Sequence, residues 1–118
     1  MEFNMEEEEQ AVVELAREIL EDHATNERQK ELEASESPYD KALWAALAKS
    51  NLLGTAIPEA YGGSDLGFMS LCLLLQEVGR TVAPIPAFPA LVLGALPLAK
   101  FGSEAHKKAW LPATVGGE

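Results

Sequence analysis

The sequence is poor in the residues that most often carry chemistry. Its 118 residues include one cysteine and two histidines, so an internal disulfide is excluded. His23 has no neighbouring histidine or cysteine with which it could share a metal ion. No glycine-rich phosphate loop with its lysine is present, nor a serine, histidine and carboxylate at a recognisable catalytic spacing. Glu59 and Glu77 are isolated carboxylates, which we expect at the surface or in caps.

Targeting and membrane-spanning signals are also missing. Met1 is followed by glutamates rather than by a basic and then an apolar stretch, so no signal peptide is expected. The longest apolar-rich stretch, residues 66–75, is far too short to span a bilayer. The single Cys72 fits a reducing compartment and a buried, unreactive thiol. We therefore expect a cytoplasmic protein without membrane contacts.

Positive charge is scarce, and negative charge is concentrated in the first third of the chain. The net charge is −10, and residues 1–36 carry 13 acidic and 3 basic side chains, which accounts for all of it. The remaining residues carry six of each sign. Such a chain should be repelled by nucleic acid and by anionic membranes. The acidic segment is expected to be a solvated helix face.

What is present is a helical pattern in a globular composition. The chain is 47% hydrophobic, with a mean hydropathy of −0.02, which suits one domain with one core. Apolar residues recur at helical spacing in the first and second predicted helices. The first stripe comprises Val12, Leu15, Ala16, Ile19 and His23, and the second comprises Tyr39, Leu43, Trp44, Leu47 and Ala48. We predict an all-α bundle of about five helices, without a convincing strand.

Helix starts are predicted from capping residues. Asn4 is the expected cap of the first helix, and Ser37 caps the second with Pro38 in its first position. The pattern of residues 24–36 does not decide between a continued helix and a loop. Ser64 or Asp65 is expected to cap a third helix that ends near residue 78. That helix is apolar almost all round, which predicts burial on most sides.

The last third of the chain predicts two further helices. Residues 87–101 form the fourth, where Pro97 should cause a kink or a break. Gly102 ends it, and Ser103 opens the fifth, which should end near Pro112.

The segment GTAIPEAYGG, residues 54–63, interrupts the helices. Pro58 fixes its own backbone angle and keeps Ile57 extended. Gly62 and Gly63 permit backbone angles closed to other residues. We predict a rigid crossing between two helices, with Ile57 and Tyr61 packed inward.

This segment begins the longest stretch that resembles a known family. LLGTAIPEAYGGSDLGFMSLCLLLQEVGR, residues 52–80, resembles the N-terminal helical domain of the flavin-dependent acyl-CoA dehydrogenases. The same holds for MEEEEQAVVELAREIL near the start, LWAALAKSNLLG in the second helix and FGSEAHKKAWLPATVGGE at the end. These four stretches occur in the family's order, and they cover nearly all of residues 1–118.

The resemblance implies a fold and an activity for the intact protein. Family members use FAD to desaturate an acyl-CoA thioester between the α and β carbons, and they pass electrons to a partner. They combine N-terminal helices, a middle β-domain and C-terminal helices, usually in oligomers, here either homo- or hetero-oligomers. The flavin-contacting motif and the catalytic glutamate of most branches belong to the other domains. We therefore expect no catalytic, cofactor-binding or metal-binding residue in residues 1–118, and we expect this chain alone to be inactive.

One wall of the family's acyl pocket does come from the N-terminal domain. The wall precedes a Leu-Gly-x-x-Pro run, which matches Leu93, Gly94 and Pro97 here. This match assigns Pro89, Ala90 and Leu93 to substrate binding. The alternative is that Leu93 is ordinary bundle core.

A second function class stays open. The run GRTVAPIPAF, residues 79–88, resembles actinobacterial branches. Some of these act on steroid or other bulky CoA thioesters and assemble from two unlike subunits. The chain could therefore be a non-catalytic interaction module, or belong to a non-catalytic subunit of a heteromeric dehydrogenase, with the acidic face as its partner surface.

Overall fold

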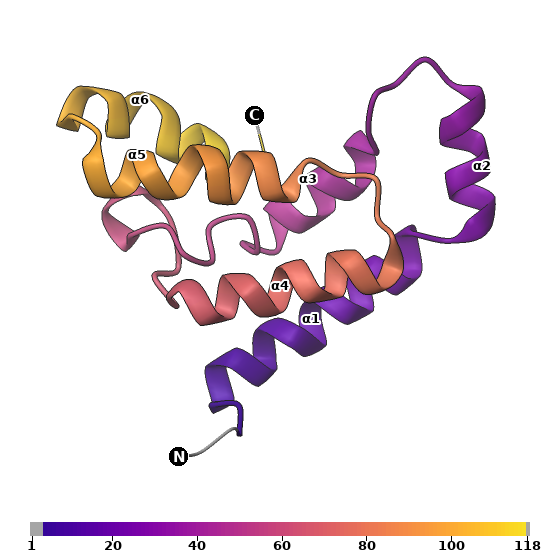
Figure 1. Ribbon diagram of the computed structural model, residues 1–118, viewed down its shortest axis with the longest axis horizontal. Helices are drawn as coiled ribbons and strands as arrows, with labels where there is room; N and C mark the ends of the chain where they lie inside the picture. Colours follow the sequence, from indigo (N-terminus) through magenta and orange to yellow (C-terminus); the bar gives the residue numbers. More distant parts are fainter. Residues whose placement is uncertain (1–3, 118) are drawn as a thin grey trace.

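The computed structural model describes residues 4–117, and in this range it is entirely helical (Figure 1). Its six α-helices and two other helical segments, with no strand among the described residues, confirm the predicted fold class. The one additional helix is residues 26–34, whose state the sequence pattern left open. In chain order the elements are α1 (Glu7–His23), α2 (Asn26–Ala34), α3 (Lys41–Lys49), η1 (Glu59–Tyr61), α4 (Phe68–Thr81), η2 (Phe88–Ala95), α5 (Leu96–Phe101) and α6 (Glu104–Val115).

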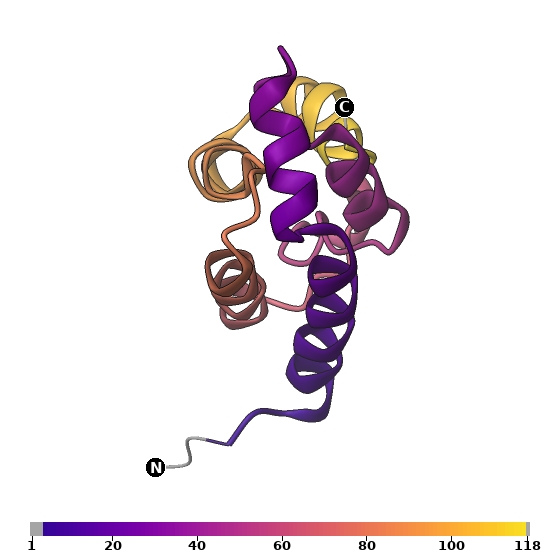
Figure 2. The same cartoon turned by 90° about the vertical axis from the view of Figure 1, so that its right-hand side faces the viewer.

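Helix α1 packs along α4, and its apolar stripe faces inward (Figures 1 and 2). The buried residues are Val12, Val13, Ala16 and Leu20, whereas Leu15 of the predicted stripe is 38% exposed. Asn4 does not cap the helix, because Glu6 occupies the N-cap position and makes no capping side-chain bond. The acidic first turn lies at the positive end of the helix dipole, which favours a helix start there without a cap.

The cap of α3 lies three residues later than the sequence pattern predicts. The carboxylate of Asp40, rather than Ser37, accepts the N–H of Leu43 at 3.1 Å, and the helix begins at Lys41. Asp40 is 1% exposed, its own N–H donates to the carbonyl of Pro84, and its carboxylate accepts bonds from Arg28. These distant partners fix the cap, so local sequence could not reveal it.

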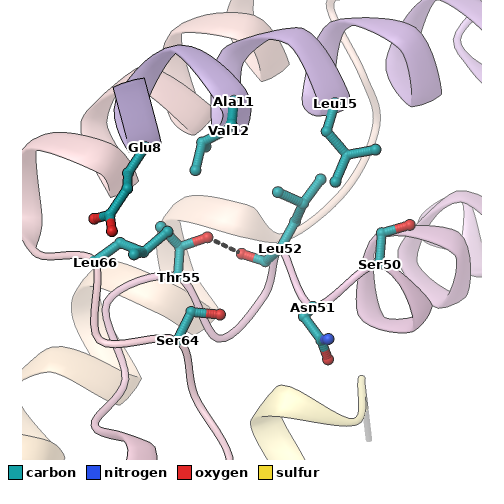
Figure 3. A pocket seen from close by; sticks show the side chains of 10 residues that line it. All are labelled: Glu8, Ala11, Val12, Leu15, Ser50, Asn51, Leu52, Thr55, Ser64 and Leu66. Carbon is teal, nitrogen blue, oxygen red and sulfur yellow. Dashed lines mark hydrogen bonds between the residues drawn. The ribbon is translucent and has the colours of Figure 1, made fainter. Parts of the chain in front are cut away.

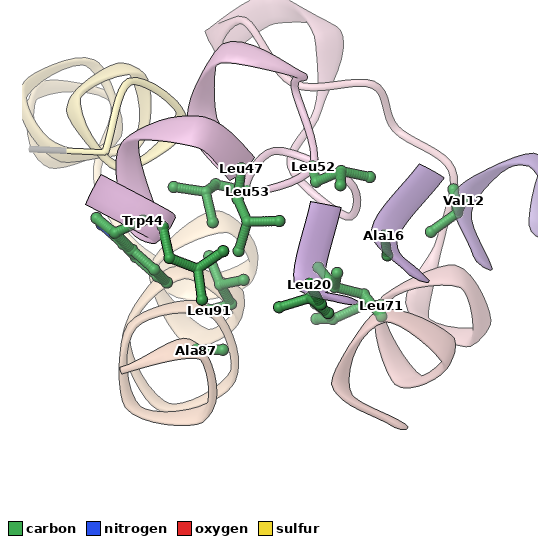
Figure 4. Packing of buried hydrophobic residues seen from close by; sticks show 12 residues of the cluster. Val12, Ala16, Leu20, Trp44, Leu47, Leu52, Leu53, Leu71, Ala87 and Leu91 are labelled. Atoms are coloured by element: carbon green, nitrogen blue, oxygen red, sulfur yellow. The ribbon is translucent and has the colours of Figure 1, made fainter. Parts of the chain in front are cut away.

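The main core gathers where α1, α3, α4 and η2 meet (Figure 4). In the predicted apolar stripe of α3, the central residues Leu43, Trp44 and Leu47 are all buried, as predicted. Leu20 and Leu71 meet in the middle of the cluster, and Ala87 and Leu91 contribute from η2. A smaller core cluster consists of Ile57, Ala95 and Leu111.

Helix α4 differs from its prediction in its start and its burial. It begins after Gly67, because Asp65 adopts φ +50° and donates its N–H to the carbonyl of Ile57. Neither Ser64 nor Asp65 is its cap. One face is buried, comprising Ser70, Leu71, Leu74 and Glu77, but Phe68 and Met69 are each 60% exposed. Cys72 is free and only half-buried.

The crossing at residues 54–63 forms as predicted for Ile57, which is 2% exposed. Gly62 has φ +90°, whereas Gly63 is required for a different reason. A Cβ atom at position 63 would lie 2.0 Å from the carbonyl oxygen of Ile57. Tyr61 is half-buried, and its hydroxyl donates to Glu104 at 2.8 Å.

Residues 88–101 form one continuous helical rod that changes its winding. Phe88–Ala95 is a π-helix, and Leu96–Phe101 is an α-helix with Pro97 in its first turn. Ala95 and Leu96 both keep right-handed helical angles, so the chain does not break at the proline. Helix α6 is capped by Ser103 as predicted and continues past Pro112 to Val115.

Candidate functional site

The three predicted substrate-binding residues all lie on η2 but differ in exposure. Leu93 is 62% exposed, Pro89 is exposed and Ala90 is half-buried. Leu93 is therefore not core in the described chain, and its alternative assignment to the core is wrong. The opposite side of η2 contributes Ala87, Leu91 and Ala95 to the two core clusters.

A shallow apolar groove of about 260 Å³ lies beside this outward face, between the η2–α5 rod and α6. Its lining contains no charged side chain. The lining residues are Ala90, Gly94, Ala95, Leu98, Trp110 and Thr114. Trp110 is 62% exposed, and small residues lie opposite it. The groove and the exposed face of η2 thus form one continuous apolar surface, which shares Ala90.

A second apolar cavity of about 260 Å³ lies between α1 and the segment that follows α3 (Figure 3). Glu8 is the one charged residue in its lining. The hydroxyl of Thr55 is occupied, because it donates to the carbonyl of Leu52 at 2.6 Å. Among the described residues, no buried side-chain nitrogen or oxygen lacks a hydrogen-bond partner. The cavity therefore has no buried polar group available to a ligand, and we assign no ligand to it.

The most strongly connected polar group is Glu77, which sequence reasoning placed at the surface or in a cap. It is 3% exposed and joins two helices. Arg17 of α1 donates to its Oε1 at 2.6 Å, and Arg80 of α4 donates to its Oε2 at 2.7 Å. Arg80 also donates to Glu21 at 2.7 Å. The spacing of Glu77 and Arg80 was visible in the sequence, but the partner sixty positions earlier was not.

The electrostatics of Glu77 fit a structural role. The hydrogen bond from Arg17 is the largest influence and lowers the pKa of Glu77, burial opposes it, and the bond from Arg80 lowers the pKa further. The same contacts raise the pKa of both arginines. A carboxylate held ionised by two cations is a poor general base. The cluster therefore fastens α1 to α4 and is not a catalytic site.

The linings of three hollows on the described residues offer no cation to a dinucleotide cofactor. The groove and the cavity above contain no lysine or arginine in their linings, nor does a third hollow between α2 and residues 82–84. A pyrophosphate needs cations or clustered backbone N–H donors. Residues 4–117 also contain no cluster of three or more residues suited to hold a metal ion.

No helix in residues 4–117 is both long and apolar enough to cross a membrane.

The match to known proteins is consistent with this geometry. The chain matches the family described as "Acyl-CoA dehydrogenase, N-terminal domain" over residues 6–118. The chain belongs to the acyl-CoA dehydrogenase family, as its N-terminal domain. The final glutamate of the resembling end motif, Glu118, lies outside the described residues.

Individual relatives support the family and its actinobacterial branch. The chain is 33% identical over 100 residues to acyl-CoA dehydrogenase FadE27 of Mycobacterium tuberculosis, which covers 85% of this chain and 27% of that protein. It is 32% identical over 85 residues to the mitochondrial isovaleryl-CoA dehydrogenase of Solanum tuberosum, with 69% and 20% covered. The chain thus spans less than a third of the length of these relatives.

Two solved structures share the fold. One is described as the "Tcur3481-Tcur3483 steroid ACAD G363A variant", with a TM-score of 0.88, 48% identity, and 94% of this chain and 30% of that chain covered. The other is the ChsE4-ChsE5 complex of Mycobacterium tuberculosis, with a TM-score of 0.92, 32% identity, and 99% and 32% covered.

Proposed function

We propose that this chain is the N-terminal domain of a FAD-dependent acyl-CoA dehydrogenase, which introduces a double bond between the α and β carbons of an acyl-CoA thioester. The observation that carries the proposal is the exposed apolar face of η2, at the residues that resemble the family's acyl wall. Leu93 would otherwise leave a large apolar side chain in water.

Within that enzyme, the role of this domain is positioning. Pro89, Ala90 and Leu93 line the acyl group and exclude water from it, since they offer apolar surface and no charge. The bound flavin supplies the hydride acceptor, and the flavin site and the catalytic base belong to parts of the protein outside residues 1–118. A cytoplasmic location and an electron-transfer partner belong to the same proposal.

The acyl group is proposed to be bulky and ring-containing. The support is the 48% identity to a protein whose description contains the words "steroid ACAD". A heteromeric assembly is proposed on similar grounds, because each of the two solved relatives is named as a pair of proteins. Each of these properties is stated for the relatives and is a proposal for this chain.

The first test is the intact mass of the natural gene product. We expect a mass several times the 12.7 kDa of this chain, a bound flavin, and flavin reduction when a ring-containing acyl-CoA is added. A mass near 12.7 kDa without flavin would contradict the proposal. It would favour the second candidate, a helical interaction module.

The names of the solved relatives favour one variant of that second candidate, a non-catalytic subunit of a heteromeric dehydrogenase. Flavin absorbance after acyl-CoA is added, measured for the product alone and again with a partner subunit, separates the two. A catalytic subunit reduces its flavin when acyl-CoA is added. A non-catalytic subunit does so only after its partner is supplied.

A further inference from the structure

The π-winding of η2 decides which of its residues face outward. The buried residues Ala87, Leu91 and Ala95 recur at a spacing of four, and Figure 4 shows Ala87 and Leu91 on the side toward the core. A helix closed by i→i+5 bonds brings residues four and five positions apart onto one face. The outward face must therefore also combine spacings of four and five.

Phe88 and Leu93 are such a pair. They are five positions apart, and they are 54% and 62% exposed. In an α-helix with 3.6 residues per turn, residues five apart diverge by about 140° around the axis. The wider π-turn removes most of that divergence, so both side chains emerge on the same outward face.

The space around Gly94 agrees with this geometry. A Cβ atom added to Gly94 would lie 3.4 Å from the carbonyl oxygen of Pro89, five positions earlier. The wide turn thus places residues five apart next to each other. The resulting outward face consists of Phe88, Pro89, Leu93, Gly94 and Pro97, all of which are exposed.

We propose that Phe88 is a specificity-determining residue for the acyl group, because the π-winding puts it on the same exposed face as Leu93. The inference rests on the proposed function and extends it to a residue that the sequence comparison did not select. The occupant of the face is the acyl group, since the face is continuous with Pro89, Ala90 and Leu93, and it carries no charged side chain.

The chemistry of the face matches a ring-containing acyl group. The flat ring of Phe88 and the branched chain of Leu93 offer broad contact to a rigid alicyclic surface. A flexible straight chain would gain less, because it loses more conformational freedom when it is held against such a face. The side chain of Phe88 cannot donate or accept a proton, so its expected effect is on binding rather than on the chemical step.

The test uses the intact protein and two non-oxidisable CoA thioethers. One thioether carries a fused-ring group, and the other carries an unbranched octyl chain. Phe88→Ala is expected to weaken binding of the fused-ring thioether about tenfold and of the octyl thioether less than about twofold. Phe88→Leu should fall between wild type and Phe88→Ala. Titration calorimetry measures the dissociation constants, and thermal unfolding checks that each variant is folded.

Phe101→Ala is the matched control. Phe101 is on the same rod and is 80% exposed, but it lies beyond the π-segment in α5. It should leave both dissociation constants unchanged. If Phe88→Ala weakens the binding of both thioethers equally, or of neither, the proposed role of Phe88 is overturned. The proposed function stands in that case as long as the wild-type protein binds the thioethers. A folded wild-type protein that binds neither thioether would overturn both.

Discussion

The α1–α4 pair and the pair made by the η2–α5 rod and α6 differ in how much of their apolar surface other residues of this chain cover. Helices α1 and α4 share the main core, and Glu77 binds an arginine from each of them. The rod and α6 share only a small core cluster, and they leave Phe88, Leu93, Phe101 and Trp110 more than half exposed. Apart from Leu15, Phe68 and Met69, whose side chains are exposed, the first pair is closed by residues of this chain. The second carries apolar surface that becomes buried only when something else covers it.

The largest expected effect is in the closed pair. Leu20 is fully buried between α1 and its neighbours. Leu20→Ala removes apolar contacts and leaves a cavity, and it should lower the free energy of unfolding by about 2–5 kcal/mol. Urea unfolding followed by circular dichroism measures this loss. A cost below about 1 kcal/mol would mean that the core rearranges freely, and the contrast between the two pairs would fail.

The next effect is expected in the crossing at residues 54–63, which joins α3 to α4 and places Ile57 in the core cluster with Ala95 and Leu111. Gly63→Ala would place a Cβ atom 2.0 Å from the carbonyl oxygen of Ile57, so the backbone must shift. We expect a loss of about 1–3 kcal/mol, as for other overpacked sites. Gly79→Ala is the control, because a Cβ atom there meets no heavy atom within 4 Å. It lies within α4, where alanine is the better helix former, so it should not destabilise.

The ion pairs of Glu77 with Arg17 and Arg80 predict that the free energy of unfolding of the closed pair depends on pH. The pKa of Glu77 is lower in the folded protein than in the unfolded chain, with the hydrogen bond from Arg17 as the main cause. Its contribution is therefore complete above the unfolded pKa of about 4.3 and is lost as the pH falls through the folded pKa.

Unfolding free energies at a series of pH values between neutral and acidic test this sign. Glu77→Gln should be less stable than wild type at neutral pH, and its stability should decline less steeply on acidification. The effect should be smaller than that of the core substitution, because both arginines are about half exposed and solvent screens them. Parallel curves for the two proteins would show that Glu77 does not contribute.

The smallest effect on stability is expected on the open face. Leu93→Ala removes a side chain that is 62% exposed and should change the free energy of unfolding by less than about 0.5 kcal/mol. In the intact enzyme it should instead extend the acyl length that is accepted. Steady-state assays across acyl-CoA lengths measure the profile. Lost stability with an unchanged profile would contradict the assignment to the acyl wall.

The sequence predicted well the features that depend on periodicity alone. Helical spacing predicted the buried residues of α3, and it predicted Val12 and Ala16 of α1 but missed Val13 and Leu20. The burial of Ile57 followed from the proline and glycines around it. The caps at Asn4, Ser37 and Ser64 or Asp65 were wrong. The true N-cap side chain of α3, Asp40, is selected by Arg28 and by the carbonyl of Pro84, which only the tertiary structure brings near.

The candidate site was predictable only in part. Resemblance assigned Pro89, Ala90 and Leu93 to the acyl wall, which stays a prediction, and it gave no information on which of them face outward. The π-winding of η2 was not predicted, because proline within a helix has several outcomes. Helix α6 remains an α-helix around Pro112, whereas the rod around Pro97 changes its winding. Glu77 was missed because its partner Arg17 is distant in sequence.

Helix α2 has a consequence for local opening of the domain. It buries no side chain, and its described ties to the body are the bonds of Arg28 to Asp40 and of Gln29 to the carbonyls of Thr81 and Val82. Its amides should therefore exchange with deuterium long before those of α1 and α4, since few contacts must break for it to open. A protease that recognises an unfolded segment would cut this helix first, and it would leave both core clusters intact.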